Sequence, residues 1–271
     1  MFAFYLKKNF CDGWDNFFFL VLSNAVNIAL LAASYFALRY ADEMSPYLFA
    51  PALVFLSSLL SVSLFAWGAS LAKIADFRSP SFALYLSALR DVWRVAAIFG
   101  AMVSAVLILI RFALSYYLRM YFLDGSLLGL VMTAALGWFV FVSVIALQYF
   151  IPLYFLQESN GFVKCLRKSF IIFYDNVAFS VQLFLVNLLL LVLSCVTFMI
   201  VPGLNGITLS CMNALRLRLY KYDWIERMSG DDPDFQKDRE KRNEVPWEEL
   251  LAEDKESLGP RKLGSFLFPW K

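Results

Sequence analysis

Residues 14–24 read WDNFFFLVLSN, a step from an aromatic residue through Asp15 and Asn16 into a long apolar run. The residues before the step mix polar and apolar side chains, whereas those after it carry no charge as far as Arg39. An apolar run of about 20 residues is long enough to cross a bilayer as a helix. We therefore expect this step to join a short surface helix to a membrane span.

The composition of the whole chain indicates a membrane protein. Of its 271 residues, 61% are hydrophobic and 17% are charged, and the mean hydropathy is +0.64. A typical soluble domain is about 45–50% apolar and about 25% charged. The excess apolar residues lie in blocks of about twenty, as membrane-spanning helices require. We predict an all-α, polytopic membrane protein, with the lipid bilayer as its first partner.

Six apolar runs are predicted to span the membrane. They cover residues 16–38, 47–74, 95–118, 126–156, 178–200 and 204–219. The fourth run exceeds the length needed to cross, so we expect it to tilt or to project into the cytoplasm, with Pro152 near its exit. The first run is longer than the core of a cleavable signal and follows Asp12 and Asp15, so we expect it to remain as a span.

The distribution of Lys and Arg predicts the orientation. Basic residues gather before the first span, between the second and third, between the fourth and fifth, and after the sixth. On the opposite side lie Arg39 and Arg119. Because cytoplasmic loops carry the excess of Lys and Arg, we predict a bacterial cytoplasmic (inner) membrane protein with both termini in the cytoplasm.

The opening step recurs 160 residues later as FYDN at residues 173–176. In this register Trp14 aligns with Tyr174, Asp15 with Asp175, Asn16 with Asn176, and Asn27 with Asn187. A shift of about 80 residues gives a fainter copy, in which Phe82 aligns with Phe2. We interpret the membrane domain, residues 1–219, as three parallel units of about 1–80, 81–160 and 161–219. Each unit would be an amphipathic helix followed by a two-span hairpin, and residues 220–271 would form a charged cytoplasmic tail.

Two hypotheses remain open for the joint residues. The candidate joints are Trp14, Asp15 and Asn16, and their counterparts Tyr174, Asp175 and Asn176. In the first hypothesis each Asp caps the following helix, since a capping carboxylate accepts hydrogen bonds from free N–H groups, while the aromatic residue anchors at the interface. In the second, the two symmetry-related carboxylates gate a cation path. We favour capping, because it explains both residue types.

Asn27 and Asn187 are candidate polar residues inside the spans. Each lies 12 residues after its Asp, which is about 18 Å along a helix and near the middle of the bilayer. A buried amide needs partners, so we expect both to join helices by hydrogen bonds. The alternative is that both coordinate a solute on the axis that relates the repeats.

Arg111 is the cation well inside the third span, roughly 10 Å from its outer end. We expect it to snorkel or to pair with Tyr116, Tyr117 or Asp124. The alternative is contact with an anion or substrate. In the fourth span, small residues recur at i+4 spacing, which favours close helix packing within or between subunits. They are Gly125, Gly129, Thr133 and Gly137.

Motifs for chemistry are scarce in this chain. It has no histidine, which excludes His-dependent hydrolysis and most zinc or haem sites. Its four cysteines are scattered without a CxxC motif. Walker, GxSxG and EF-hand patterns are missing as well. We therefore predict no catalytic residues, no metal, no cofactor and no nucleic-acid partner, and we expect that the chain is not an enzyme.

The tail opens with the basic-apolar stretch RLRLYKYDW at 216–224 and continues to EVPWEELLAEDKE at 244–256, which predicts a short helix. It closes with FLFPWK at 266–271, where Phe266, Phe268 and Trp270 are candidates to dock on the membrane or on the cytoplasmic face of the protein. A partly ordered tail is the favoured interpretation. A protein partner at the tail or at the cytoplasmic face is the alternative.

The stretch WDNFFFLVLSN at 14–24 and the basic-aromatic entry KCLRKSF at 164–170 resemble the YesL-like family of bacterial integral membrane proteins. The resemblance concerns the membrane portion and does not reach the residues after about 225. It implies a hairpin-repeat membrane fold of six spans. The function of that family is unknown, so the resemblance carries over no catalytic residues.

From these observations we expect a non-enzymatic accessory, assembly or scaffold component of the inner membrane. The alternative is a small-solute transporter or channel that uses Asn27, Asn187 and Arg111. A membrane enzyme ranks third, because paired carboxylates and histidine are missing from the spans.

Overall fold

Helices form the regular secondary structure of the described residues, 1–158, 161–231 and 244–261, in a computed structural model. They are α1 (Phe2–Asp15), α2 (Phe17–Met44), α3 (Pro46–Ala75), α4 (Phe82–Asp124), α5 (Leu127–Leu147), α6 (Phe150–Leu156), α7 (Phe162–Asp175), α8 (Val177–Val196), α9 (Gly203–Asp231), α11 (Trp247–Leu250) and α12 (Ala252–Leu258). The predicted all-α class is confirmed.

Five stretches of the described chain are long and apolar enough to cross a bilayer. They are α2, α3 from Tyr47, α4, the α5–α6 stretch Leu127–Leu156, and α8. By helix length and composition, the structure agrees with the membrane character predicted from the sequence. The sixth predicted span, 204–219, lies in α9 and is not among the five, because this segment itself contains Asn205, Asn213, Arg216 and Arg218. Six spans, their orientation and the threefold repeat stay predictions.

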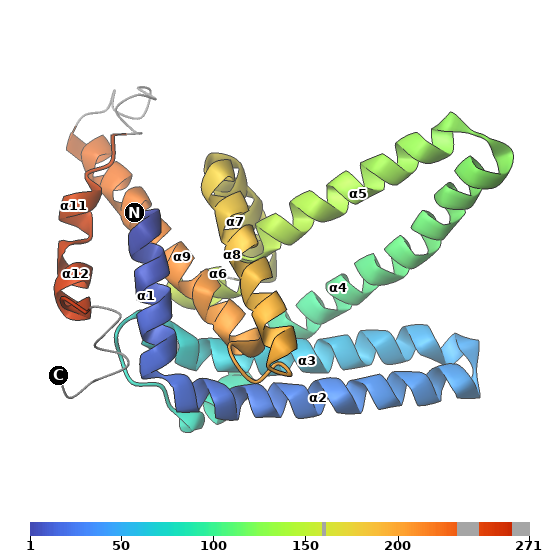
Figure 1. The fold of residues 1–271 in the computed structure, drawn as a ribbon, viewed down its shortest axis with the longest axis horizontal. Coiled ribbons are helices and arrows are strands. Elements are labelled where there is room, and N and C mark those ends of the chain that lie inside the picture. The colour runs from blue at the N-terminus through green and yellow to red at the C-terminus, as the bar shows by residue number, and fades with distance from the viewer. Residues whose placement is uncertain (159–160, 232–243, 262–271) are drawn as a thin grey trace.

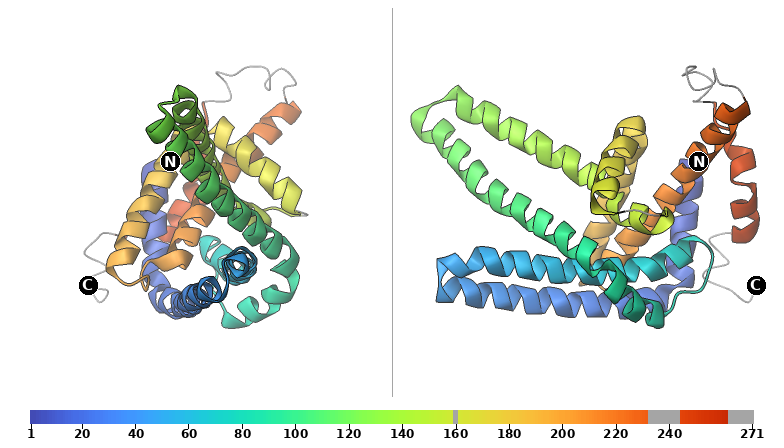
Figure 2. Two further views of the ribbon diagram at one scale, coloured as in Figure 1. Left: turned by 90° about the vertical axis from the view of Figure 1, so that its right-hand side faces the viewer. Right: turned by 180° about the vertical axis from the view of Figure 1, so that it is seen from behind.

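The helices form two long hairpins that diverge from a common base (Figure 1). One hairpin is α2–α3 and the other is α4–α5. The base holds α1, α6, α7, α8 and α9, and α11 and α12 lie beside α1 and α9, away from the hairpin tips. Both views in Figure 2, taken with Figure 1, show α8 running across the α2–α3 hairpin and not alongside it.

Helix α4 is an unbroken helix of 43 residues, about 64 Å long. Ser81 is its N-cap, and the Ser81 hydroxyl accepts a hydrogen bond from the Ala83 N–H at 3.1 Å. Gly125, in the left-handed conformation at φ 64°, ends it. The predicted second amphipathic helix is therefore continuous with the third span, whereas the other two amphipathic helices, α1 and α7, are separated from α2 and α8 by a joint.

The first part of α4 lies close against α3. A Cβ atom added at Gly100 would lie 2.5 Å from the backbone oxygen of Ser57, so only glycine permits this approach. Closer to the start of α4, its Tyr85 ring stacks on the Trp67 ring of α3 with centroids 3.9 Å apart. These contacts fix the two hairpins to each other near the base.

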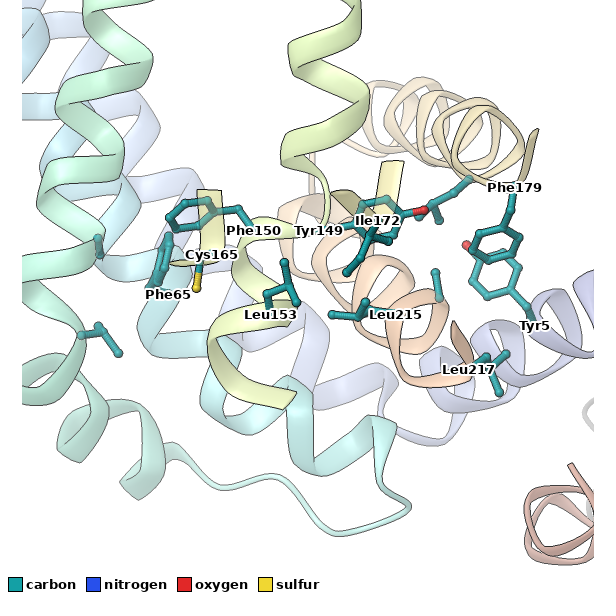
Figure 3. Packing of buried hydrophobic residues seen from close by; sticks show 14 of the residues in the cluster. Tyr5, Phe65, Tyr149, Phe150, Leu153, Cys165, Ile172, Phe179, Leu215 and Leu217 are labelled. Carbon is teal, nitrogen blue, oxygen red and sulfur yellow. The ribbon is translucent and has the colours of Figure 1, made fainter. Parts of the chain in front are cut away.

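Helix α9 passes through the core of the base. Its side chains Leu209, Met212, Ala214, Leu215 and Leu217 are buried. Figure 3 shows Leu215 and Leu217 in the cluster that also contains Tyr5 of α1 and Phe179 of α8, whose ring centroids are 6.1 Å apart. The helix therefore joins the N-terminal helix to the later helices of the chain.

The described part of the predicted tail is docked on this base. Position 220 lies inside α9, so the predicted boundary between membrane domain and tail is not a break in secondary structure. The segment 244–256 forms two short helices, α11 and α12, and Leu251 and Leu258 are buried. Asp254 accepts two hydrogen bonds from Arg216, at 3.0 and 3.1 Å. Phe266, Phe268 and Trp270 lie outside the described residues.

Candidate functional site

Polar side chains from three helices, together with Gln148, form a hydrogen-bonded network around Asn187. The Oδ1 atom of Asn187 accepts from the Ser210 hydroxyl at 2.6 Å. Its Nδ2 atom donates to Gln148 Oε1 at 3.3 Å and to Cys211 Sγ at 3.2 Å. Ser210 also lies 2.6 Å from the Tyr5 hydroxyl. Asn187 therefore connects α1, α8, α9 and the residue that follows α5.

Asn27 is enclosed by a different set of residues. Its Nδ2 atom donates to Asn205 Oδ1 at 3.0 Å, and its Oδ1 atom accepts from the Ser63 hydroxyl at 3.1 Å. The side chain is 1% exposed. This arrangement agrees with the expected role in joining helices, and it leaves no surface of Asn27 for a solute.

Asn24 holds the connection between α8 and α9, a role that the sequence pattern did not single out. Its Nδ2 atom donates to the carbonyl oxygens of Ile200 and Pro202, at 3.0 and 2.7 Å, and its Oδ1 atom accepts from the Asn205 N–H at 3.0 Å. Asn205 in turn bonds Asn27. The amides spaced along α2 were visible in the sequence, but the partners of Asn24 lie far away in the chain, beyond α8.

A cavity of about 280 Å³ lies beside Asn187, between α4, α5, α6, α8 and α9. Gln148, Asn187 and Thr208 give it a small polar area, and the remaining wall is mostly apolar. Asn27 is not part of this wall. The structure therefore does not bring the two candidate asparagines to one site.

Arg111 lies apart from both asparagines, in the part of α4 that diverges from the base. Its guanidinium carbon lies 4.7 Å from the centre of the Phe49 ring in α3. Arg111 lines a surface pocket together with Tyr116 and Arg119. Of the three partners expected from the sequence, Tyr116 therefore lies beside it. Within the described residues, no ion pair joins Arg111 to Asp124.

The two joints have the same backbone construction. Asn16 and Asn176 each end one helix and begin the next. The Nδ2 atom of each donates to the carbonyl oxygen four residues earlier, at 2.9 and 3.2 Å. Trp14 and Tyr174 are 48% and 67% exposed, as expected for residues at a membrane interface.

The aspartates at the joints differ from the capping hypothesis. The N-cap position of α2 and of α8 belongs to asparagine, and each Asp is the last residue of the preceding helix. Asp15 pairs with Arg261. Asp175 pairs with Lys221 at 3.3 Å and accepts from the Tyr222 hydroxyl at 2.8 Å. Their carboxylates therefore bind side chains of the C-terminal region and not the first N–H groups of a span.

The ionisation of Asp175 reflects these partners. Partial burial raises the pKa of its carboxyl group, but the hydrogen bond from Tyr222 and the charge of Lys221 together lower it by more, so the net pKa lies below the ordinary value. Burial together with the bond to Asp175 raises the pKa of Tyr222. Asp175 is therefore ionised at neutral pH.

A buried ion pair in α1 was not predicted from the sequence. Lys8 is fully buried, and its Nζ atom lies 2.8 Å from Asp12 and 3.5 Å from the centre of the Phe77 ring. Burial lowers the pKa of Lys8 and raises the pKa of Asp12, and each charge opposes the shift of the other. The i, i+4 spacing was visible in the sequence, but an amphipathic helix normally places such a pair in solvent.

The small residues of the fourth span serve different purposes. A Cβ atom added at Gly129 would lie 2.6 Å from the Tyr117 carbonyl oxygen, so this glycine permits α4 and α5 to approach. Gly125 instead ends α4. Gly137 has open space beside it, and the buried Thr133 hydroxyl has no partner among the described residues. Close packing within the chain therefore rests on one member of the stripe.

Comparison with protein-family models, with curated proteins and with solved structures finds no match to this chain. The resemblance to YesL-like proteins therefore stays a prediction. Within the part of the chain that the structure describes, no group of three or more His, Cys, Asp or Glu side chains gathers as a metal site.

Proposed function

We propose that the protein is a non-enzymatic accessory, assembly or scaffold component of the bacterial cytoplasmic membrane. In this proposal both termini and the docked tail face the cytoplasm, and a YesL-like fold of six spans in three units places the basic residues on that side. The observation that supports it most is the exposed apolar surface of the α4–α5 hairpin. Val131, Trp138 and Phe139 of α5 are 60%, 67% and 58% exposed.

This hairpin differs from the base in what its side chains contact. Beyond the crossing with α3, the distal halves of α4 and α5 pack mainly on each other (Figure 1). By contrast, the polar groups Asn27 of α2 and Asn187 of α8 are used in internal hydrogen bonds. A membrane arm of this kind suits lateral contact with the helices of a partner protein.

Site-specific photo-crosslinking in native membranes tests this proposal. A benzophenone amino acid at Phe139 should give one discrete protein adduct, because the proposed partner covers the arm. Phe36, which is 69% exposed on α2, is a matched control and should give lipid adducts alone. Lipid adducts at both positions would contradict the arm as a partner surface.

The transporter or channel alternative is supported by the cavity beside Asn187. Purified protein in liposomes would be assayed for solute-driven swelling with a panel of small neutral and charged solutes. Flux that is lost in Asn187→Leu and retained in Asn27→Leu would favour this alternative, because only Asn187 lines the cavity. Our leading proposal expects no flux above that of empty liposomes.

A further inference from the structure

Helices α8 and α9 form a hairpin whose turn, residues 197–202, contacts the first half of α2. The Nδ2 atom of Asn24 in α2 donates to the carbonyl oxygens of Ile200 and Pro202, at 3.0 and 2.7 Å. Asn24 lies about 12 Å along the helix from the start of α2 and about 30 Å from its end. The turn is therefore far from the tip of the α2–α3 hairpin.

The α8–α9 turn also differs from the tips of the two long hairpins in its charge. Asp42 and Glu43 lie just before the α2–α3 tip, and Asp124 is the last residue of α4 at the other tip. By contrast, the chain contains no Lys, Arg, Asp or Glu from 176 to 215. Charged side chains are costly within hydrocarbon, so they are expected where a hairpin tip meets water. The α8–α9 turn has no such mark.

The side chains that project from this turn are apolar and exposed. Val196, Phe198 and Ile200 are 72%, 83% and 43% exposed. The exposed apolar surface continues along α8 through Leu189 and Val192. A continuous apolar surface of this kind is typical of contact with lipid or protein and not with water.

The backbone of the turn is hydrogen-bonded within the protein. The Met199 N–H donates to the Ser194 carbonyl oxygen at 2.6 Å, and the Gly203 N–H donates to the Ser194 hydroxyl at 2.9 Å. The other N–H groups of residues 197–203 also donate to protein acceptors, and Pro202 has no N–H. A turn in water can use water as acceptor, whereas a turn at membrane depth must find its partners in the protein.

The direction of α8 agrees with a hairpin that turns back inside the bilayer. Figures 1 and 2 show α8 running across the α2–α3 hairpin, so α8 is strongly inclined to the membrane normal if α2 crosses the bilayer. The two ends of the α8–α9 hairpin lie together, because Asp175, just before α8, pairs with Lys221 of α9 at 3.3 Å. The hairpin therefore begins and ends on the same side, and its turn reaches only the level of Asn24.

We propose that α8 and the first half of α9 form a re-entrant hairpin. It enters the bilayer from the cytoplasmic side, places its turn among the acyl chains of the lipids, and returns without crossing. The inference rests on the orientation in the proposed function and deepens it: α2, α3, α4 and α5 cross the bilayer, whereas the two segments of the third unit do not. The apolar surface around Phe198 is thus a contact surface for acyl chains.

Fluorescence quenching in proteoliposomes measures the depth of the turn. A bimane label at Phe198→Cys, in the full-length protein with Cys195→Ser, would be compared with the same label at Leu22→Cys and at Tyr40→Cys. Leu22 and Tyr40 are 57% and 66% exposed and mark the first and last parts of α2. Quenching by lipids brominated at different acyl carbons should place the turn at the depth of Leu22 or deeper. A depth equal to that of Tyr40 would overturn the proposal.

Thiol labelling of intact cells separates the re-entrant hairpin from the orientation on which it rests. An impermeant maleimide should react from outside with Glu43→Cys and leave Phe198→Cys unmodified. Reaction at both positions would support the orientation but overturn the re-entrant hairpin in favour of full crossings. Reaction from outside at Lys164→Cys and not at Glu43→Cys would contradict the proposed orientation and the cytoplasmic entry. The quenching depth, which is measured against α2, would then still decide whether the hairpin crosses.

A charged side chain at the turn gives a test without a label. Phe198→Lys places an ammonium group among acyl chains, so the melting temperature in nanodiscs should fall below that of the wild type. Tyr47→Lys is the matched control at the α2–α3 tip, where Tyr47 is 89% exposed, and it should change the melting temperature little. Equal melting temperatures in the two variants would contradict a turn in lipid. If Phe198→Lys does not fold, the bimane depth at Phe198→Cys decides the question.

Discussion

At the residue scale, the Lys8–Asp12 pair shows how α1 is bound to the base. An amphipathic helix on a membrane surface would place both charges in water, yet Lys8 is fully buried and Asp12 is 5% exposed. The pair lies beside Phe77, and the hydroxyl of the nearby Tyr5 reaches Ser210 of α9. The helix is therefore part of the core and not only an interfacial anchor.

We predict that Asp12→Ala strongly lowers the thermal stability of the protein in detergent. It leaves Lys8 as an unpaired buried charge, and breaking a buried pair costs about 3–5 kcal/mol. Asp15→Ala is the control, because its pair with Arg261 is partly exposed and contributes about 0–1 kcal/mol. Equal losses of melting temperature in the two variants would contradict the buried pair. The double variant Lys8→Met/Asp12→Leu should recover most of the loss.

The lowered pKa of Asp175 predicts a pH-dependent contribution to stability. A carboxyl group with a lower pKa in the folded state stabilises the protein above its unfolded pKa of about 3.9. This stabilisation is lost as the pH falls through the folded pKa. The melting temperature of the wild type should therefore exceed that of Asp175→Asn at pH 7, and the difference should shrink on acidification below about pH 4. A constant difference across this range would exclude the role of the charge.

At the element scale, two glycines of α5 with similar sequence spacing have different surroundings in the α4–α5 hairpin. Spacing alone placed Gly129 and Gly137 on one face, since helix positions eight residues apart point in similar directions. The structure shows that the two helices approach closely at Gly129, whereas Gly137 has open space beside it. The splay of a hairpin depends on the whole set of packed side chains, so a periodic pattern does not predict where contact ends.

We predict opposite outcomes for leucine at these two glycines. Gly129→Leu should destabilise the hairpin by about 1–3 kcal/mol or more, because the new side chain meets the backbone of α4. Gly137→Leu should be neutral or slightly stabilising, since leucine favours helix over glycine by about 1 kcal/mol. Thermal unfolding monitored by circular dichroism in the same detergent compares them. A loss at Gly137 would indicate that a second copy or another protein packs there.

At the scale of the whole molecule, the helical class and the apolar stretches were predictable because bilayer length and backbone hydrogen bonding restrict what a membrane segment can be. For Asn27 and Asn187, the sequence predicted hydrogen bonds between helices but not which residues would be the partners. Which amide meets which depends on the position of α9, and the apolar run at 204–219 predicted a span there without indicating which helices it would contact. The sequence also did not indicate that Arg218 of α9 would contact the rings of Phe179 in α8 and Trp247 in α11.

The predicted orientation can be measured by cysteine accessibility. In a Cys195→Ser background, which removes the exposed native thiol, cysteines at Glu43 and Asp124 should react from the outer side of intact cells. Cysteines at Lys7 and Lys164 should react only after the cells are opened. Labelling of both pairs from the same side would contradict the proposed orientation with both termini in the cytoplasm.

The length of α4 has a mechanical consequence. At about 64 Å, the helix is roughly twice as long as the hydrocarbon core of a bilayer is thick. Gly100 marks a close approach of α4 to α3, and the end of α4 at Asp124 lies about 36 Å further along the helix. If α4 tilted by about 10° about this approach, the hairpin tip would move through about 6 Å. A small rearrangement in the base would then give a larger displacement at the opposite end of the hairpin.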